Sequence, residues 1–368
     1  MRVCLIGPIP PFRGGIAKYC YALAQELEKR HELLLVSYRR QYPKILYGRK
    51  SQTDPAVERE QILARFARLT FDLDSVNPLS WRQTVEKIRE FKPETVIIPW
   101  WVAYWTPMYL YLLWALKRRG IRVVVLCINV FEHEANPLKK FLTRLLLARA
   151  DHLIVHSTQE MRQLQAFNPT ATLRKQLLPL FTYDAAPCVR SDDKLHLLFF
   201  GFVRLYKGLD LLLEAVAILR ERDISLKIAG EFWNGKDEYL RLMAKLGISD
   251  RVEITDRYVT DDEMSRFFAW ADLIVLPYRR TLTSGVIATA YGYGKPVLAT
   301  NVGGFSEVVM DGATGKLVEP GSARALAEGI EWFSNNRQVD FPGNIQALAA
   351  EQMSWSSLVD LIEEFDRL

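Results

Sequence analysis

The chain has 368 residues, of which 49% are hydrophobic, 25% charged and 11% aromatic. This composition excludes a disordered chain, a collagen-like fibre and a disulfide-stapled small protein, and the length predicts two domains. Residues 1–180 carry 28 Lys and Arg against 15 Asp and Glu, whereas residues 181–368 carry 20 against 28. The basic half favours an anionic partner, but no zinc-finger, RNA-binding or basic-zipper pattern points to nucleic acid.

In the first half, short apolar runs alternate with segments of helical periodicity. The expected strands are Val3–Ile6, Leu33–Val36, Thr95–Ile98, Val123–Leu126 and Leu153–Val155. The expected helices are Ile16–Leu27, Trp81–Phe91, Thr106–Arg119 and Leu138–Ala148. Apolar strands separated by helices of this length are typical of a parallel sheet with both faces covered.

One uncharged segment, Thr95–Leu116, is long enough to cross a bilayer. Pro99 and Pro107 interrupt it, and its tryptophans crowd the middle rather than the ends. We therefore expect a buried strand, an aromatic loop and a helix instead of a membrane span. The strand-like run directly after Met1 leaves no room for a signal peptide, so a cytoplasmic location is expected.

The polar segment Phe181–Lys194 is the expected linker, and a second alternating series follows it. Its expected strands are Leu195–Phe200, Leu226–Ile228, Val252–Ile254, Leu273–Leu276 and Val297–Ala299. Its expected helices are Leu209–Arg220, Glu238–Lys245, Asp261–Trp270, a helix from Gly285, and Ala323–Phe333. The domains expected are 1–185 and 186–353, with an amphipathic helix at 354–368 that packs back on the first. Two such α/β domains have their ligand crevices at the carboxyl ends of their strands.

The loop after the first strand of the second domain carries cations. Gly201 ends the strand, Arg204 and Lys207 follow, and Gly208 opens a helix. Two cations above a helix N-terminus are typical of an anion site. Because loop charges contribute little to folding, replacing either cation is expected to leave the melting temperature almost unchanged.

Two further loops suit phosphate binding. Ser284 and Gly285 form a turn between a strand and a helix, where free amides point at an anion. Gly14 and Gly15 follow the first strand of the chain, where a backbone without side chains permits close approach.

These motifs together resemble a retaining glycosyltransferase of the GT-B fold, similar to glycosyltransferase family 4. The resemblance rests on five segments: Gly14-Gly15; Gly201 with Arg204, Lys207 and Gly208; Gly294-Lys295-Pro296-Val297; Gly303-Gly304 with Glu307; and Asp311-Gly312 with Thr314-Gly315. It implies two tandem Rossmann-like domains. It also implies transfer of a hexose from a nucleotide-diphosphate sugar to a carbohydrate or lipid-linked glycan, with no metal ion or other cofactor.

The resemblance also assigns roles to residues. Arg204 and Lys207 would bind the diphosphate, and His133 would lie near the reaction centre, although a structural histidine is an equal alternative. The donor-binding set would be Gly14, Gly15, Gly201, Arg204, Lys207, Thr281, Thr283, Ser284, Gly285, Val286 and Thr289. The acceptor side would include Arg13, Lys18, Trp100 and Trp101.

One departure from the family pattern concerns the donor sugar. Family members usually carry two glutamates where this chain has Thr281 and Thr289. Threonine is shorter and neutral, so ribose recognition is expected to be weaker or supplied elsewhere. A GT-B-fold nucleotide-sugar 2-epimerase and a non-catalytic nucleotide-sugar-binding relative remain as alternatives.

The basic residues of the first half are interleaved with aromatic ones. Those following the second strand are Arg39, Arg40, Lys44, Arg49 and Lys50, and those following the aromatic segment are Lys117, Arg118, Arg119 and Arg122. Such a mixture favours peripheral attachment to an anionic membrane surface, with a solvated basic face as the alternative.

Overall fold

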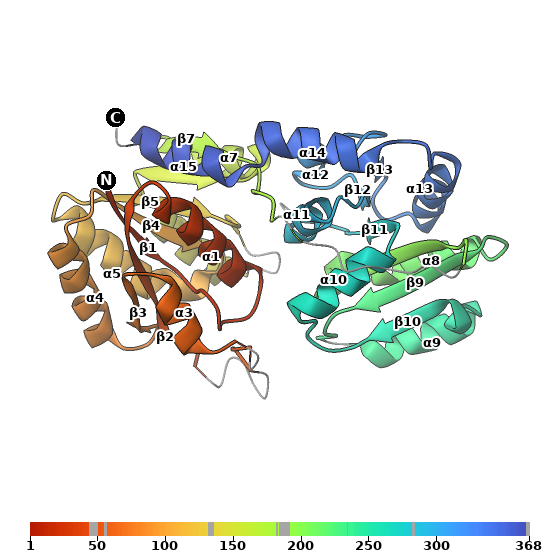
Figure 1. Ribbon diagram of the computed structural model, residues 1–368, viewed down its shortest axis with the longest axis horizontal. Coiled ribbons are helices and arrows are strands. Elements are labelled where there is room, and N and C mark those ends of the chain that lie inside the picture. Colours follow the sequence, from red (N-terminus) through yellow and green to blue (C-terminus); the bar gives the residue numbers. More distant parts are fainter. Residues whose placement is uncertain are drawn as a thin grey trace. The chain divides into compact units, whose positions relative to one another are not determined.

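The computed structural model describes residues 1–43, 51–54, 57–131, 136–181, 183, 192–233, 235–281 and 284–365. These residues form two compact units, one of residues 1–177 with 354–368 and one of residues 178–353. Each unit is a parallel sheet with helices on both faces (Figure 1).

The first unit contains a seven-stranded parallel sheet in its described residues. In spatial order its strands are β3 (Leu69–Asp74), β2 (Glu32–Arg40), β1 (Arg2–Ile6), β4 (Thr95–Trp100), β5 (Arg122–Cys127), β6 (His152–Val155) and β7 (Thr172–Lys175). The central strands are apolar runs buried on both faces, as expected for a sheet between two helical layers.

The helices of this unit follow the expected alternation. They are α1 (Gly15–Glu28), α3 (Arg59–Arg65), α4 (Pro78–Phe91), the 3₁₀ turn η1 (Ala103–Trp105), α5 (Thr106–Lys117), α6 (Pro137–Leu147), α7 (Thr158–Gln165) and α15 (Trp355–Glu364). The C-terminal helix α15 packs against α1, and the rings of Trp355 and Tyr19 lie 5.1 Å apart between them. Ser354 caps α15 by accepting a hydrogen bond from the backbone N of Ser357.

The second unit contains a six-stranded parallel sheet, again among the residues described. Its strands in spatial order are β10 (Val252–Thr255), β9 (Ile224–Ala229), β8 (Leu195–Phe200), β11 (Leu273–Leu276), β12 (Val297–Thr300) and β13 (Gly315–Val318). Its helical elements are η2 (Leu205–Lys207), α8 (Leu209–Ile218), α9 (Lys236–Leu246), η3 (Ser249–Arg251), α10 (Asp261–Trp270), α11 (Gly285–Gly292), α12 (Phe305–Val308), α13 (Ala323–Asn335) and α14 (Phe341–Gln352).

Both sheets are doubly wound, and each has one point where the strand order reverses. This point lies between β1 and β4 in the first unit and between β8 and β11 in the second. Ligands of open α/β sheets bind at the carboxyl ends of the strands beside such a point. The loops after β1, β4, β8 and β11 are therefore the places to look for a site.

The first unit ends at Leu177, earlier than the expected boundary at residue 185. The following residues pack on the second unit, because the backbone N of Leu180 donates to Met353 O at 2.8 Å and the Tyr183 ring stacks on Tyr293 at 4.6 Å. Within the expected linker, residues 182 and 184–191 lie outside the described part of the chain.

The aromatic segment forms the expected strand, loop and helix, as β4, η1 and α5. Trp105, in its loop, is only 1% exposed and packs between Tyr38 and Tyr109. Among the helices that the structure describes, none combines the length and the apolar character needed to cross a bilayer.

Candidate functional site

The loop after β8 brings the predicted cations to the reversal point of the second sheet. Gly201 has a φ of 94°, and a Cβ atom built there would lie 3.2 Å from Lys207 Nζ and 3.7 Å from Val286 Cγ2. Glycine is needed here because the backbone adopts a left-handed conformation and lies close to the Lys207 amine. Gly201, Lys207 and Val286, all expected from the family resemblance to bind the donor, are thus neighbours.

Lys207 is a buried cation, with 7% of its surface exposed. Burial, together with the nearby charge of Arg204, lowers the pKa of its ammonium to about 8. Its Nζ lies 5.4 Å from the centre of the Tyr278 ring, and no carboxylate of the described residues forms an ion pair with it. A buried ammonium in this setting is stabilised by a ligand that brings negative charge.

Arg204 precedes η2 and stacks on an aromatic ring. Its guanidinium carbon lies 4.0 Å from the centre of the Trp233 ring, in the loop after β9. Phe202 packs edge-on against the same ring at 5.7 Å. Trp233 was not predicted as a site residue, although a tryptophan four residues after the end of β9 was a usable signal. Stacking restricts the Arg204 side chain and so orients its guanidinium group.

Gly208 allows the loops after β8 and β11 to touch. It has a φ of 66°, and a Cβ atom there would lie 2.1 Å from Pro277 O. Arg279, in the second loop, forms an ion pair with Asp210 at 2.5 Å and donates its backbone N to Tyr206 O at 2.7 Å. Neither residue of this pair was predicted to belong to the site.

The remaining donor-side predictions lie around the start of α11. Ser284 caps the helix by accepting from the backbone N of Val286 at 3.2 Å, and a Cβ atom at Gly285 would meet nothing within 4 Å. Thr281 is buried, and Thr289 donates its hydroxyl to Gly285 O at 2.9 Å. Thr283 lies outside the described residues. The open helix start and the Thr289 oxygen, which can still accept a hydrogen bond, both suit a polar ligand.

The glycine loop after β1 leaves the N-terminus of α1 open. Gly14 has a φ of 101° and supplies no side-chain cap, and a Cβ atom at Gly14 or Gly15 would meet nothing within 4 Å. Arg13 and Lys18 flank this start and are half-buried. The backbone N of Arg13 donates to Gln52 O at 2.9 Å, which holds the loop in place.

The two predicted tryptophans have different environments. Trp100 is 1% exposed and donates its Nε1 to Val130 O at 3.2 Å, so it is a core residue. The structure does not support Trp100 as an acceptor contact, because β4 turns this side chain into the packed interior. Trp101 is half-buried and donates its Nε1 to Tyr42 Oη at 3.3 Å.

His133 lies outside the described residues, whereas His156 is buried in the first unit. Its Nδ1 lies 2.8 Å from Gln176 O, which can only accept, so Nδ1 carries the proton and Nε2 accepts from Tyr19 Oη at 3.3 Å. Burial lowers the pKa of His156 to about 4, which keeps the ring neutral at pH 7. His156 therefore has structural partners on both nitrogens.

Two family descriptions match the chain, one in each unit. Residues 14–175 match the "Glycosyl transferase 4-like domain", and residues 194–336 match "Glycosyl transferases group 1". Together they confirm the resemblance inferred from the glycine and cation motifs.

Curated relatives point to the same family. The chain is 31% identical over 216 residues to a D-inositol 3-phosphate glycosyltransferase of Paenarthrobacter aurescens, covering 56% of this chain and 52% of the relative. It is 34% identical over 167 residues to the enzyme of the same name from Pseudarthrobacter chlorophenolicus, covering 44% of this chain and 40% of that relative. The chain spans about half the length of the curated relatives it matches.

Solved structures share the fold along the whole chain. Anabaena HepE in complex with UDP-glucose superposes with a TM-score of 0.75 at 17% identity, covering 100% of both chains. Sucrose-phosphate synthase from Thermosynechococcus elongatus gives 0.74 at 17% identity, covering 100% of this chain and 98% of the other. The expected two-domain GT-B fold is therefore confirmed.

Proposed function

The chain belongs to the glycosyl transferases group 1 family, and from this premise we propose that it is a retaining hexosyltransferase. It moves a hexose from a nucleoside-diphosphate sugar to a carbohydrate or lipid-linked glycan acceptor. The observation that carries the proposal is the buried ammonium of Lys207 beside Arg204, at the reversal point of the second sheet. HepE is described in complex with UDP-glucose, which supports UDP-sugars as the first donors to test.

The two cations act on the leaving group in this proposal. When the anomeric bond breaks, negative charge builds on the departing diphosphate, and a preorganised cation stabilises it most at that moment. Lys207 supplies a charge from a low-dielectric position, and Arg204 supplies directed N–H donors held by the Trp233 ring. This role needs no metal ion, so chelation with EDTA is expected to leave turnover unchanged.

The remaining assignments complete the donor site. In this proposal Gly201, Gly285 and Val286 of the second unit present backbone to the donor, and the family resemblance assigns Gly14 and Gly15 of the first unit to donor binding as well. We assign the hydroxyls of Thr281, Ser284 and Thr289 to hydrogen bonds with its sugar and ribose, and the family resemblance adds Thr283 to this set. The family resemblance assigns His133 to the reaction centre, and we assign Arg13, Lys18 and Trp101 to acceptor binding.

Purified protein with a panel of nucleotide sugars tests the proposal. Slow donor hydrolysis identifies a transferase, inversion at C2 identifies an epimerase, and binding without turnover identifies a non-catalytic relative. Arg204→Ala and Lys207→Ala should each lower kcat/KM by the equivalent of about 2–4 kcal/mol. Arg222→Ala is the matched control, because Arg222 belongs to the same unit and pairs with Glu331 at 3.0 Å on the surface. Full turnover in both site variants would show that the diphosphate binds at another place.

We also propose that the protein works at the cytoplasmic face of an anionic membrane, as a peripheral protein held by its first unit. Several cations behind this expectation are engaged in ion pairs, namely Lys117 with Asp151 and Arg119 with Glu86. Stronger support comes from α6, whose start exposes Leu138 and Phe141 at 63% and 59%. Lys44, Arg49 and Lys50 lie outside the described residues.

Helix α6 combines exposed apolar side chains with charge. Lys139, Lys140 and Arg144 accompany Leu138 and Phe141, and residues 136–149 contain no carboxylate. This pattern suits a bilayer interface. Co-sedimentation with anionic vesicles should be salt-sensitive and should fall in a variant with Leu138 and Phe141 changed to Ser. Equal partitioning onto neutral and anionic vesicles would contradict the membrane proposal.

A further inference from the structure

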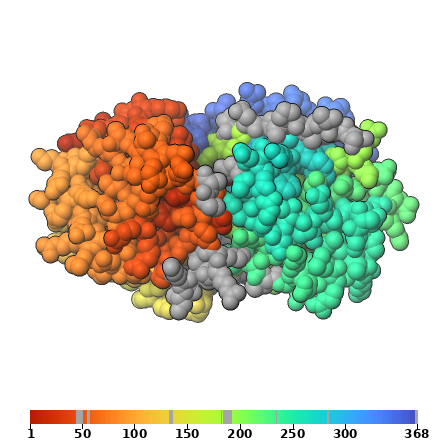
Figure 2. Space-filling model, turned by 60° about the horizontal axis from the view of Figure 1, so that its bottom comes forward, coloured from red at the N-terminus to blue at the C-terminus, as the bar shows by residue number. Residues whose placement is uncertain are grey.

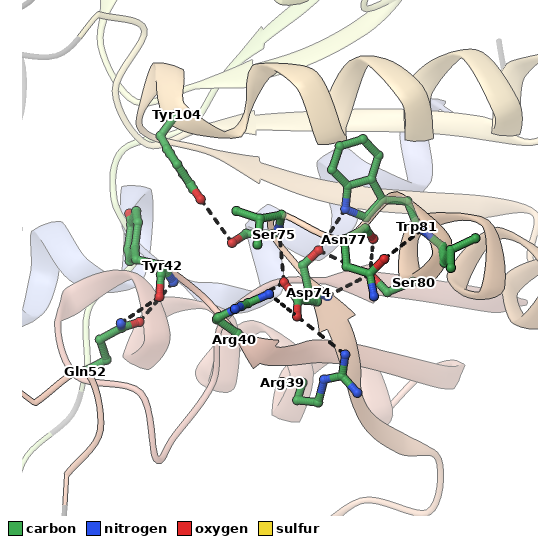
Figure 3. Close-up of polar contacts among 12 residues, drawn as sticks. Arg39, Arg40, Tyr42, Gln52, Asp74, Ser75, Asn77, Ser80, Trp81 and Tyr104 are labelled. Carbon is green, nitrogen blue, oxygen red and sulfur yellow. Dashed lines mark hydrogen bonds and ion pairs between the residues drawn. The ribbon is translucent and has the colours of Figure 1, made fainter. Parts of the chain in front are cut away.

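A buried carboxylate lies at the carboxyl end of β3 in the first unit. Asp74 is 3% exposed and accepts two hydrogen bonds from Arg40, from Nε at 3.0 Å and from Nη2 at 2.8 Å (Figure 3). The backbone N of Val76 donates to its Oδ1 at 3.1 Å. This bidentate geometry fixes the plane of the Arg40 guanidinium.

A second arginine reaches the same carboxylate. The Nη2 of Arg39 lies 3.5 Å from Asp74 Oδ2, and the side chains of Arg39 and Arg40 are 60% and 47% exposed. Two guanidinium groups share one carboxylate, which leaves one positive charge in excess within this trio. Each guanidinium has five N–H donors, more than Asp74 can use, so donors remain for another anion.

Three half-buried rings lie next to this pair and form an aromatic platform, defined as Tyr42, Trp101 and Tyr104. The rings of Tyr42 and Tyr104 lie 5.3 Å apart, and the fully buried Trp105 supports all three from below. A ring face carries partial negative charge and packs against C–H groups, while the phenol and indole edges hydrogen-bond. Such a platform suits the flat face of a sugar ring.

Ser75 joins the platform to the arginines. Its backbone N donates to Arg40 O at 3.2 Å, and its hydroxyl lies 3.2 Å from Tyr104 Oη (Figure 3). The side chain of Gln52 holds Tyr42 by hydrogen bonds to its backbone N and O at 3.0 and 2.9 Å.

The segments from β2 to α5, red-orange to orange in Figure 2, form much of the surface of the first unit in that view.

We infer that this edge of β2, β3 and β4 binds the acceptor, and that the acceptor carries an anionic group, a phosphate or a carboxylate, on a sugar ring. The arginines bind the anionic group and the aromatic platform binds the ring. This inference rests on the proposed function, because the ligand is taken to be the acceptor of the proposed transfer. Asp74 is a positioning residue that orients the two arginines and does not touch the ligand.

Binding of three probes to the full-length chain tests the inference. Glucose, glucose 1-phosphate and glucuronic acid are titrated by calorimetry, with excess UDP present to fill the proposed donor site. At least one charged sugar should bind more tightly than glucose, and the better one identifies phosphate or carboxylate as the recognised group. Arg39→Gln should weaken that probe about tenfold, the scale of one charged hydrogen bond, without changing the affinity for glucose.

The control is Arg65→Gln, because Arg65 is 46% exposed in the same unit and pairs with Glu28 at 2.8 Å. It should bind all three probes like the unaltered protein. Asp74→Asn should also weaken the charged probe, although it adds net positive charge, because the arginines lose their orientation. Circular dichroism checks that this buried variant folds, and Arg39→Gln carries the test if it does not.

Two outcomes would overturn the inference: equal affinity for glucose and both charged sugars, or unchanged affinity in Arg39→Gln. Tighter binding by folded Asp74→Asn would also contradict the orienting role. Donor hydrolysis is measured separately on the same variants. Its absence in the unaltered protein would refute the proposed function, whereas a failed binding test with intact hydrolysis would refute this inference alone.

Discussion

Arg279 forms a bidentate ion pair with Asp210, with its two terminal nitrogens 2.8 and 2.5 Å from the two carboxylate oxygens. Through this pair the loop after β11 holds the first turn of α8. The Arg279 backbone N also donates to Tyr206 O at 2.7 Å, directly beside Lys207. Arg279 therefore fixes the turn that carries the proposed phosphate-binding lysine.

Arg279→Lys should lower kcat/KM about tenfold while the affinity for the acceptor stays unchanged, because small misplacements of a charged group weaken transition-state stabilisation. The charge is retained, so the effect isolates the loss of bidentate geometry. The free energy of unfolding should fall by only about 1 kcal/mol, since the pair is partly exposed. Arg222→Lys, whose arginine pairs with Glu331 away from the site, is the kinetic control. Identical kcat/KM in both variants would mean that Arg279 does not position Lys207.

Gly208→Ala and Gly247→Ala form a matched pair. Both glycines have left-handed backbone, with φ of 66° and 67°, but only a Cβ atom at 208 meets a neighbour, Pro277 O at 2.1 Å. Gly247→Ala should cost about 1 kcal/mol of unfolding free energy, the penalty of the left-handed conformation. Gly208→Ala should cost clearly more and should reduce donor turnover. Urea unfolding and donor hydrolysis measure both effects, and equal losses would contradict the close approach at Pro277.

Lys207 should make donor binding depend on pH. Its pKa lies at about 8 because of burial, so the ammonium that attracts the diphosphate loses its proton as the pH rises past that value. The Kd for UDP, followed by calorimetry from pH 7 to 10, should rise above about pH 8. A flat profile would show that the ammonium does not contact the diphosphate.

The same burial affects stability, contrary to the expectation that loop cations matter little. Between the folded pKa of about 8 and the ordinary value of 10.5, the unfolded chain binds the proton that the folded chain has lost. The free energy of unfolding attributable to Lys207 therefore rises with pH across this window. Below the window Lys207 is charged in both states, and burying its charge destabilises the folded state. Lys207→Met should be more stable at pH 7 by about 1–3 kcal/mol while losing donor turnover. A lower melting temperature for Lys207→Met would contradict this account.

Glu160 should be needed for the fold of the first unit. This fully buried carboxylate in α7 accepts from the backbone N of Val130 at 3.2 Å, from that of His156 at 3.3 Å and from the Ser157 hydroxyl at 3.1 Å. An amide presents N–H groups to some of these donors, so Glu160→Gln should lose about 2 kcal/mol of unfolding free energy. Glu253→Gln, at a 62% exposed position that pairs with Lys227, should lose almost none. Equal urea midpoints for Glu160→Gln and the unaltered protein would show that Glu160 does not stabilise the first unit.

Hydrogen exchange can localise the effect of Glu160→Gln. Because Val130 lies in the loop after β5, faster exchange of the Val130 amide is expected in the variant. His133 follows Val130 by three residues in the sequence, so a change in turnover alongside the faster exchange would link the buried carboxylate to the proposed reaction centre.

The central strands could be read from the sequence because a parallel strand buried on both faces is a continuous apolar run. The expected Leu195–Phe200 and Leu273–Leu276 are confirmed as β8 and β11. The edge strands β3, β7 and β13 were missed for the opposite reason, whereas the edge strand β10 was expected as Val252–Ile254. In β3 the exposed Asp72 alternates with buried Phe71 and Leu73, so no uninterrupted apolar run appears.

The sequence by itself determined the alternation of strands and helices, the glycines at the loops and the presence of two cations after β8. These features are local, since they depend on periodicity and on neighbours along the chain. Only the tertiary structure decided that Lys207 is buried, that Trp233 supports Arg204, and that Arg279 pairs with a carboxylate 69 residues away. It likewise brought Asp74 to Arg40. Burial and pairing depend on which strand ends meet at one edge of a sheet, and that is a property of strand order in space.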